Sequence, residues 1–177
     1  MEARQQSWPR IWLMTDERLG EGLWNAIARL PANAGIVFRH YSLAPTEWAR
    51  LARDITDMVR DRGITLAIAA DVELAKAVAS EFVHNPSSAT DLPFSRSVHN
   101  VEQAEAARSA GAALVFVSPV YATRSHPRRE PLGVEHAAKI AQAAGVPAIA
   151  LGGVDAQNFP SLEQDGFYGW AGIDAWM

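Results

Sequence analysis

The chain has 177 residues, of which 49% are hydrophobic and 20% charged, a composition typical of one globular domain with a sizeable core. The formal net charge of −4 argues against general nucleic-acid binding, and the lack of cysteine excludes disulfides, cysteine metal ligands and a cysteine nucleophile. No apolar run reaches the ~20 residues of a membrane helix, and the polar N-terminus lacks a signal-peptide core. We therefore expect a cytoplasmic protein with neither a nucleic-acid nor a membrane partner.

Short apolar runs alternate with amphipathic segments along the chain. We expect strands at 11–14, 35–38, 64–69, 82–83, 96–99, 113–117, 147–151 and 168–175. We expect helices at 23–30, 45–62, 72–79, 101–110, 134–144 and 157–164. Residues 85–95 contain two prolines and four hydroxyl side chains, which predicts a loop.

Eight strands with helices between most of them predict one α/β domain over residues 1–177, a parallel (β/α)8 TIM barrel. An open doubly wound sheet is the alternative. The chain is short for a barrel, which usually has ~250 residues, and the final helix is missing after the last strand. An uncovered apolar strand end predicts a homodimer, formed through the C-terminal tryptophans or the neighbouring helices.

Polar residues follow the predicted strands, and the carboxyl ends of barrel strands are where reactive side chains gather. Arg39 follows the second strand, where a charge needs a partner or a ligand. Ser97 and His99 lie on the fifth strand. Gly152 and Gly153 follow the seventh, and they indicate either a tight turn that requires glycine or a backbone that approaches an anion.

The sixth predicted strand leads into a loop that is rich in basic and hydroxyl side chains. Guanidinium groups and hydroxyls bind phosphoryl oxygens, so the loop is a candidate anion site. The alternative is a solvated surface loop. The side chains in question are Thr123, Arg124, Ser125, His126, Arg128 and Arg129.

Histidines at positions 84, 99 and 126 lie in three separate segments, which is more typical of hydrogen-bonded structural groups than of metal ligands. The sequence shows no Ser-His-Asp arrangement, P-loop or dinucleotide fingerprint.

Two stretches, SVHNVEQAEAARSAGAALVFVSPVYATRSHPRREPLG and VPAIALGGVDAQN, resemble thiamine-phosphate synthase and its relative the thiazole tautomerase. The opening IWLMTD is similar to the first strand of that family. The resemblance implies a barrel whose mouth joins a pyrimidine pyrophosphate to a thiazole phosphate, while magnesium and basic residues neutralise the departing pyrophosphate. Thr123 and Ser125 match the two threonines of the family's anion loop, and Arg39 matches an arginine of its second strand.

Several family positions are substituted. The two magnesium aspartates are replaced by Ala70 and by residues 86–88, so magnesium lacks its usual ligands, the cofactor is unknown, and Asp71 and Asp91 are only weak metal candidates. The loop lysine is His126, and Asp174 replaces a serine that helps to hold phosphate.

We expect a phosphorylated small-molecule ligand, and three hypotheses follow for the function. The first is a divergent synthase that uses Arg39, His99 and His126 for catalysis. The second is a metal-free isomerase in which His99 or His126 moves a proton. The third is a non-catalytic binding protein that kept the barrel. The candidate phosphate-binding residues are Ser97, Thr123, Arg124, Ser125, Gly152 and Gly153.

Overall fold

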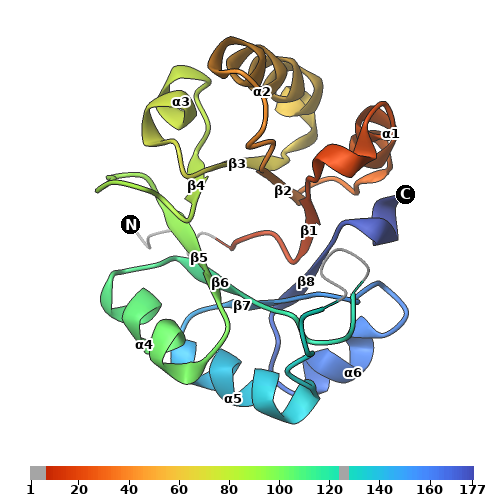
Figure 1. The fold of residues 1–177 in the computed structure, drawn as a ribbon, viewed down its shortest axis with the longest axis vertical. Helices are drawn as coiled ribbons and strands as arrows, with labels where there is room; N and C mark the ends of the chain where they lie inside the picture. Colours follow the sequence, from red (N-terminus) through yellow and green to blue (C-terminus); the bar gives the residue numbers. More distant parts are fainter. Residues whose placement is uncertain (1–6, 124–127) are drawn as a thin grey trace, which may run out of the picture.

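Eight parallel strands close into a barrel in chain order (Figure 1) in the computed structural model, which describes residues 7–123 and 128–177. Pairing of Ile11 with Trp170 and of Trp12 with Ala171 joins the first strand to the last and closes the barrel. The predicted barrel is therefore confirmed, and the open sheet is excluded. The strands are β1 (Ile11–Met14), β2 (Gly35–Phe38), β3 (Thr65–Ala69), β4 (Phe82–His84), β5 (Phe94–Val98), β6 (Leu114–Val117), β7 (Ala148–Leu151) and β8 (Gly169–Gly172).

Six α-helices of the described residues form an outer layer around the barrel (Figure 1). Each of these helices connects two successive strands, and only the connection from β4 to β5 contains no helix among the described residues. The helices are α1 (Gly22–Arg29), α2 (Pro45–Val59), α3 (Val72–Ala77), α4 (Val101–Ser109), α5 (Val134–Ala144) and α6 (Phe159–Gln164). None of them is long and apolar enough to cross a membrane.

Local sequence accounts for the helix ends. Pro45 occupies the first turn of α2, where its missing N–H is not needed. Asp71 and Asn100 cap α3 and α4, because their side chains accept hydrogen bonds from backbone amides of the first turn. Gly145 ends α5 in the left-handed conformation that favours glycine.

Several predicted boundaries differ from the structure by one to three residues, and two of these differences matter most. β5 begins at Phe94, inside the segment expected to be loop, because Phe94 pairs with Val83 of β4. The last strand ends at Gly172 rather than at residue 175, and Asp174–Trp176 forms the short 3-10 helix η3. This turn stacks the ring of Trp176 on that of Trp170, with centroids 5.4 Å apart, so Trp176 covers part of the wall expected to be bare.

The barrel interior is filled by aromatic and branched side chains, among them Trp12, Phe82 and Phe116. The Trp12 and Phe116 rings meet edge to face, with centroids 5.5 Å apart. A Cβ at Gly35 would lie 2.2 Å from the Trp12 ring, so glycine is required beside this large side chain. The interior is therefore a packed core rather than a channel.

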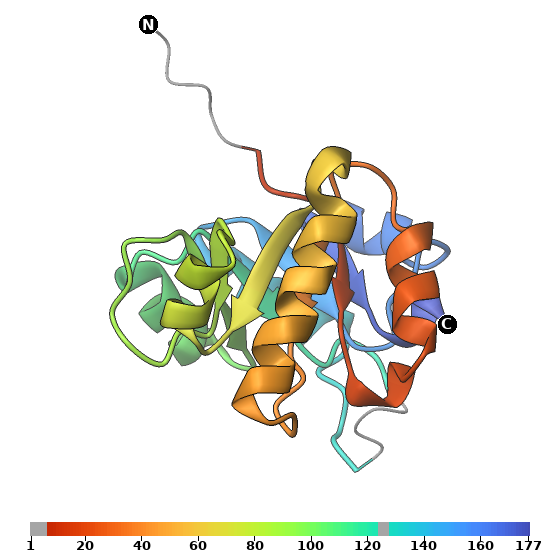
Figure 2. The same cartoon turned by 90° about the horizontal axis from the view of Figure 1, so that it is seen from above.

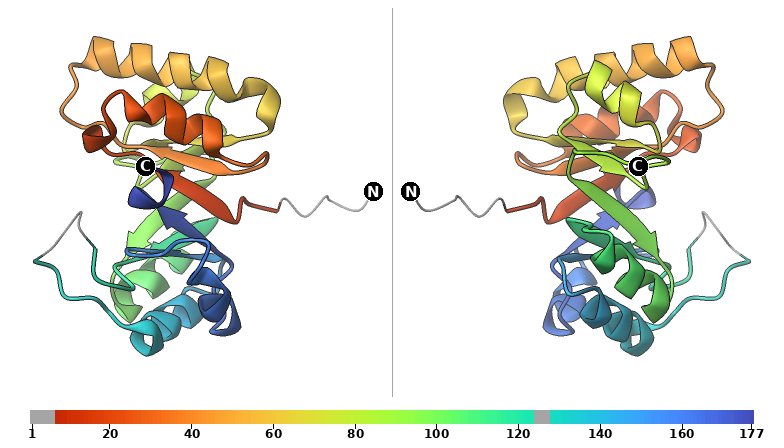
Figure 3. Two further views of the ribbon diagram at one scale, coloured as in Figure 1. Left: turned by 90° about the vertical axis from the view of Figure 1, so that its right-hand side faces the viewer. Right: turned by 90° about the vertical axis from the view of Figure 1, so that its left-hand side faces the viewer.

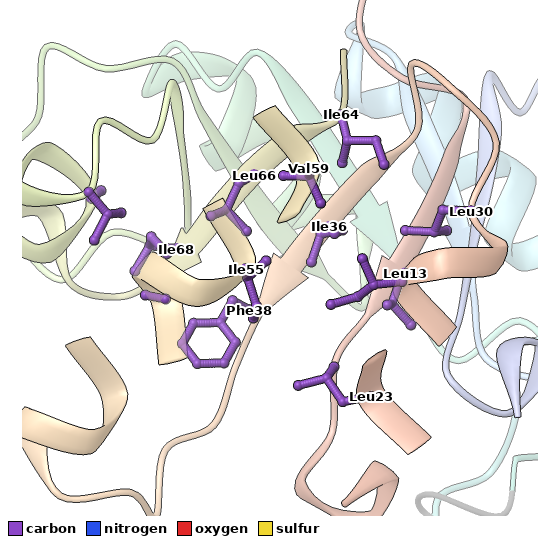
Figure 4. Close-up of a cluster of buried hydrophobic side chains, with 14 of the residues drawn as sticks. Leu13, Leu23, Leu30, Ile36, Phe38, Ile55, Val59, Ile64, Leu66 and Ile68 are labelled. Carbon is purple, nitrogen blue, oxygen red and sulfur yellow. The ribbon is translucent and has the colours of Figure 1, made fainter. Parts of the chain in front are cut away.

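Two further clusters fill the space between the strands and the helices. One packs β1–β4 against α1–α3, and Figure 4 shows ten of its labelled side chains, including Leu13, Ile36 and Ile55. The other packs β5–β8 against α4–α6. Partly buried Phe94 and Trp176 contact both clusters.

The strands all point to one end of the barrel, and the described chain enters β1 from the other end (Figure 2). The described residues 118–123 and 128–133, between β6 and α5, lie at the end to which the strands point (Figure 3). The residues that follow the strands therefore form a mouth at that end.

Candidate functional site

A cavity of about 280 Å³ opens at the carboxyl ends of the strands, and we call it the mouth cavity. Two arginines and several polar and apolar residues line it, and they come from β5, from the end of β7 and from the segments that follow β2, β4, β5, β6, β7 and β8. The residues that matter for the chemistry are Arg39, Asn85, Ser97, His99, Thr123, Arg129 and Gly152. A neighbouring cavity, also of about 280 Å³, shares Thr123 and Gly152 and adds Gly153 and Asp174.

Arg39 is anchored to the end of β1. Its backbone N–H donates to Thr15 Oγ1 at 2.9 Å, and its side-chain Nε donates to the Thr15 carbonyl at 3.0 Å. The guanidinium lies 3.9 Å from the carboxylate of Asp16. Burial lowers the pKa of Arg39, partly opposed by Tyr41 and Asp16. The side chain is thus a fixed, partly desolvated charge at the mouth.

Asp16 has a second basic partner that sequence reasoning missed. Arg18 Nε donates to Asp16 Oδ1 at 2.8 Å, and Arg18 also lies 3.9 Å from Asp174. Burial raises the pKa of Asp16, but the hydrogen bonds of Arg18 and the charges of Arg18 and Arg39 outweigh it and hold that pKa low. Arg18 therefore offsets part of the negative charge that Asp174 brings to the neighbouring cavity.

His84 lies beneath the mouth cavity at the centre of a hydrogen-bond network. Asn85 Nδ2 can only donate, and it lies 3.1 Å from His84 Nε2. Nε2 is therefore the acceptor, and Nδ1–H donates to Ser95 Oγ at 2.9 Å. Ser97 Oγ lies 3.1 Å from the same Nε2, and the Ser97 amide donates to Asn85 Oδ1 at 2.8 Å.

This network requires a neutral imidazole. Burial, reinforced by the charges of Arg39 and Arg96, lowers the pKa of His84 to about 3. His84 is therefore a structural group that orients Asn85 and Ser97 toward the mouth cavity. It matches the role that the sequence favoured for the histidines.

The His99 ring is oriented by a hydrogen bond to the backbone carbonyl of Ser118, which directly follows β6. Its Nδ1 lies 2.6 Å from the Ser118 carbonyl, which can only accept, so Nδ1 carries a proton. The neutral ring then has its lone pair on Nε2, and this atom has no hydrogen-bond partner within residues 7–123 and 128–177. His99 thus presents a group that can accept a proton at the mouth.

Gly152 and Gly153 have positive φ values of 98° and 65°. A Cβ at Gly152 would lie 2.8 Å from Pro119 Cα, and a Cβ at Gly153 would lie 2.7 Å from the Ala122 carbonyl. Tight packing against the segment after β6 therefore already explains why glycine is needed here. Both residues also line the neighbouring cavity.

The carboxylates considered for magnesium do not meet. Asp71 Oδ1 accepts the Leu74 amide at 2.8 Å as the cap of α3, and Asp91 is an exposed partner of Lys76 at 3.2 Å. Neither lines the mouth cavity. Among the described residues there is no group of three histidine or carboxylate side chains that could hold a metal ion. The residues of this part of the chain do not fit the magnesium that the family resemblance implies.

Five of the candidate site residues surround the mouth cavity, namely Arg39, Ser97, His99, Thr123 and Gly152. Gly153 lines the neighbouring cavity. Three further candidates, Arg124, Ser125 and His126, lie outside the described residues. Asn85 and Arg18 were not among the predicted site residues. Asn85 directly follows β4, a position that the strand-end rule already singles out.

Comparisons with known proteins agree with this architecture. The sequence is 28% identical to the thiamine-phosphate synthase of Roseiflexus sp. (strain RS-1), over 93% of this chain and 77% of that protein. It is 27% identical to the thiamine-phosphate synthase of Syntrophomonas wolfei, over 94% of this chain and 88% of the relative. The fold matches a thiamine phosphate pyrophosphorylase from Pyrococcus furiosus with a TM-score of 0.79 and 22% identity, over 94% of this chain and 86% of the other.

A family description covers almost the whole chain as well. Residues 14–176 match the family described as thiamine monophosphate synthase. This range contains every strand of the barrel except the first three residues of β1. Residues on both sides of the mouth fall within this match. The chain therefore belongs to the thiamine monophosphate synthase family.

Proposed function

We propose that this protein is a divergent thiamine-phosphate synthase, which joins a hydroxymethylpyrimidine pyrophosphate to a thiazole phosphate and releases pyrophosphate. One observation carries the proposal: Arg39, Ser97, His99, Thr123 and Gly152, chosen from separate parts of the sequence, line one mouth cavity. Family membership supplies the class of reaction. A cytoplasmic location is part of the same proposal.

The basic residues of the mouth carry the chemistry in this proposal. Pyrophosphate leaves with the electron pair of the bond that breaks, so negative charge grows on its oxygens during the reaction. Arg39 is fixed beside the cavity, and Arg129 also lines it. Preorganised cations of this kind stabilise developing charge more than they stabilise the substrate. No step is assigned to magnesium, because the described carboxylates do not form a site for it.

The two phosphorylated groups would be divided between the sides of the mouth. The thiazole phosphate is assigned to Thr123, Gly152 and Gly153, which line the neighbouring cavity. The pyrophosphate is assigned to the side of Arg39. His84 acts only through Asn85 and Ser97, whose polar atoms it orients.

Product formation tests this proposal directly. Purified protein is mixed with both substrates, with and without magnesium, and thiamine phosphate is measured by mass spectrometry alongside released pyrophosphate. Arg39→Ala should lower the rate, whereas Arg53→Ala on the exposed face of α2 should leave it unchanged. Absence of product under both conditions, from folded protein, would refute the synthase assignment.

A second function is favoured by the state of His99. His99 lines the mouth cavity, and its Nε2 has no hydrogen-bond partner among the described residues, which suits proton transfer on a thiazole-like ligand without a metal. Exchange of a ligand proton for deuterium, followed by NMR, tests it, and His99→Gln should abolish the exchange. Binding of pyrophosphate with neither reaction would instead identify a non-catalytic binding protein.

A further inference from the structure

The outer helix layer is interrupted between β4 and β5. Figure 1 shows α3 and α4 as successive helices of this layer, with only the loop from residue 85 to residue 93 between them. A cavity of about 420 Å³ lies there, lined by Pro86, Ser88, Thr90, Phe94, Arg96 and Ala110, among others, and we call it the side pocket. None of its lining residues lines the mouth cavity.

Arg96 supplies a positive charge to the side pocket. Ser95 and Ser97 face the barrel interior and the mouth, and alternation along β5 places Arg96 on the outer face between them. One guanidinium nitrogen donates to the Pro86 carbonyl at 3.1 Å, and the group lies over the Phe94 ring at 5.4 Å. Both contacts hold the guanidinium in one orientation.

The charge of Arg96 has no anionic partner in the part of the chain that the structure describes. No carboxylate of residues 7–123 or 128–177 lies within 4.0 Å of it, although the side chain is partly buried. Asp91, in the loop between β4 and β5, is exposed and paired with Lys76 at 3.2 Å. A partly desolvated guanidinium without a counter-ion is incompletely compensated, and four of its five N–H donors remain for a ligand.

Two hydroxyls add donors to the same pocket. Thr90 Oγ1 accepts the Leu92 amide at 3.0 Å, so its own proton is still available to a ligand. Ser88 also lines the pocket, and its hydroxyl makes no hydrogen bond with the described residues. Ser87 is different, because its hydroxyl already donates to the Ala70 carbonyl at 2.8 Å.

We propose that the side pocket is a second anion site, which binds the phosphoryl group of a small molecule on the outer wall of the barrel. Arg96 donates to two of its oxygens, and the hydroxyls of Ser88 and Thr90 donate to the remaining one. A guanidinium fork alone satisfies the two oxygens of a carboxylate, whereas the third oxygen of a phosphoryl group needs donors from another direction. The site is independent of the synthase assignment.

A titration of isotopically labelled protein with inorganic phosphate, followed by two-dimensional amide NMR, tests the proposal. The amides of residues 87–90 should shift and saturate with a dissociation constant of about 1 mM or below. Arg96→Gln should weaken this binding at least ten-fold, about 1.4 kcal/mol. The matched control Arg53→Gln, on the exposed face of α2, should leave it unchanged.

Further measurements separate the side pocket from the mouth and from general effects of Arg96. Arg39→Ala should leave the shifts at residues 87–90 intact. The double variant Ser88→Ala, Thr90→Val keeps Arg96 in place and should still weaken phosphate binding about five-fold, the scale of lost hydrogen bonds. No saturable shifts in folded wild-type protein would overturn the proposal, and so would formate binding as tightly as phosphate.

Discussion

Acidification should destabilise this protein through a single buried histidine. The pKa of His84 is lowered from 6.5 to about 3 in the folded chain, because burial and the charges of Arg39 and Arg96 disfavour the protonated ring. As the pH falls, the unfolded chain therefore takes up a proton before the folded one does. The stabilisation is complete above about pH 6.5 and is lost progressively between about pH 6.5 and pH 3.

The size of the effect follows from the two pKa values. Each pH unit within that window removes about 1.4 kcal/mol from the free energy of unfolding. Between pH 7.5 and pH 4.5 the loss from His84 amounts to roughly 2.7 kcal/mol, since only the two units below pH 6.5 contribute. This is a large share of the roughly 5–15 kcal/mol that stabilises a typical domain.

His84→Asn isolates this contribution. The asparagine amide keeps a donor near the position of Nδ1 for Ser95, and it does not titrate. At about pH 7.5 the variant should be less stable by roughly 2–3 kcal/mol, because it leaves a small cavity and removes the acceptor for Asn85 and Ser97. At about pH 4.5 the difference should fall to near zero, because only the wild type has lost stability through this ring.

Urea unfolding of both proteins, followed by tryptophan fluorescence, measures the difference at each pH. The chain has six tryptophans. Burial also lowers the pKa of His40, but this contribution is common to both proteins and cancels in the comparison. If the two stability curves stayed parallel from about pH 7.5 to pH 4.5, the assignment of a neutral, hydrogen-bonded His84 would be wrong.

Three other predictions concern the mouth and the assembly. Gly152→Ala should destabilise the fold by roughly 2–4 kcal/mol, because an alanine there is strained and its Cβ meets Pro119. Gly22→Ala, with open space around its Cβ, should leave the stability nearly unchanged, and urea unfolding of both variants measures the difference. Arg39→Ala should weaken pyrophosphate binding by roughly 1.5–3 kcal/mol in calorimetry, and magnesium should change wild-type affinity less than about ten-fold. Light scattering should give a homodimer, about twice the 19.2 kDa chain mass, and a monomer would contradict the predicted interface at the C-terminal tryptophans or the neighbouring helices.

Strands that are buried on both faces, and a helix with a regular apolar period, were the easiest elements to predict. β1, β2 and α5 have the predicted bounds, because a continuous apolar run or a clean helical period marks each of them. β5 is less visible in the sequence. Its inward residues Ser95 and Ser97 are polar and are satisfied by His84 and Asn85, so hydropathy does not mark the start of the strand.

Residues at the ends of strands could likewise be predicted, because the barrel brings those ends together. Arg39, His99 and Gly152 were found in this way and line one cavity. The position of Arg18 depends on closure of β8 onto β1, which brings Asp174 within 3.9 Å, and no local pattern reports that distance. The same holds for the hydrogen bonds around His84, because three segments must meet before its protonation state is determined.

The β4–β5 junction, which no helix covers, bears on the cooperativity of unfolding. β4 and β5 pair over two residues only, the shortest ladder in the barrel, and only η3 follows β8 within the described chain. Each half thus has four strands, three helices and a hydrophobic cluster of its own, and Phe94 and Trp176 contact both clusters. Sub-global opening should follow these two boundaries, with faster amide hydrogen exchange in β4 and β5 than in β2 and β3. A chain cut in the exposed segment 87–89 should leave two fragments that reassociate into one barrel.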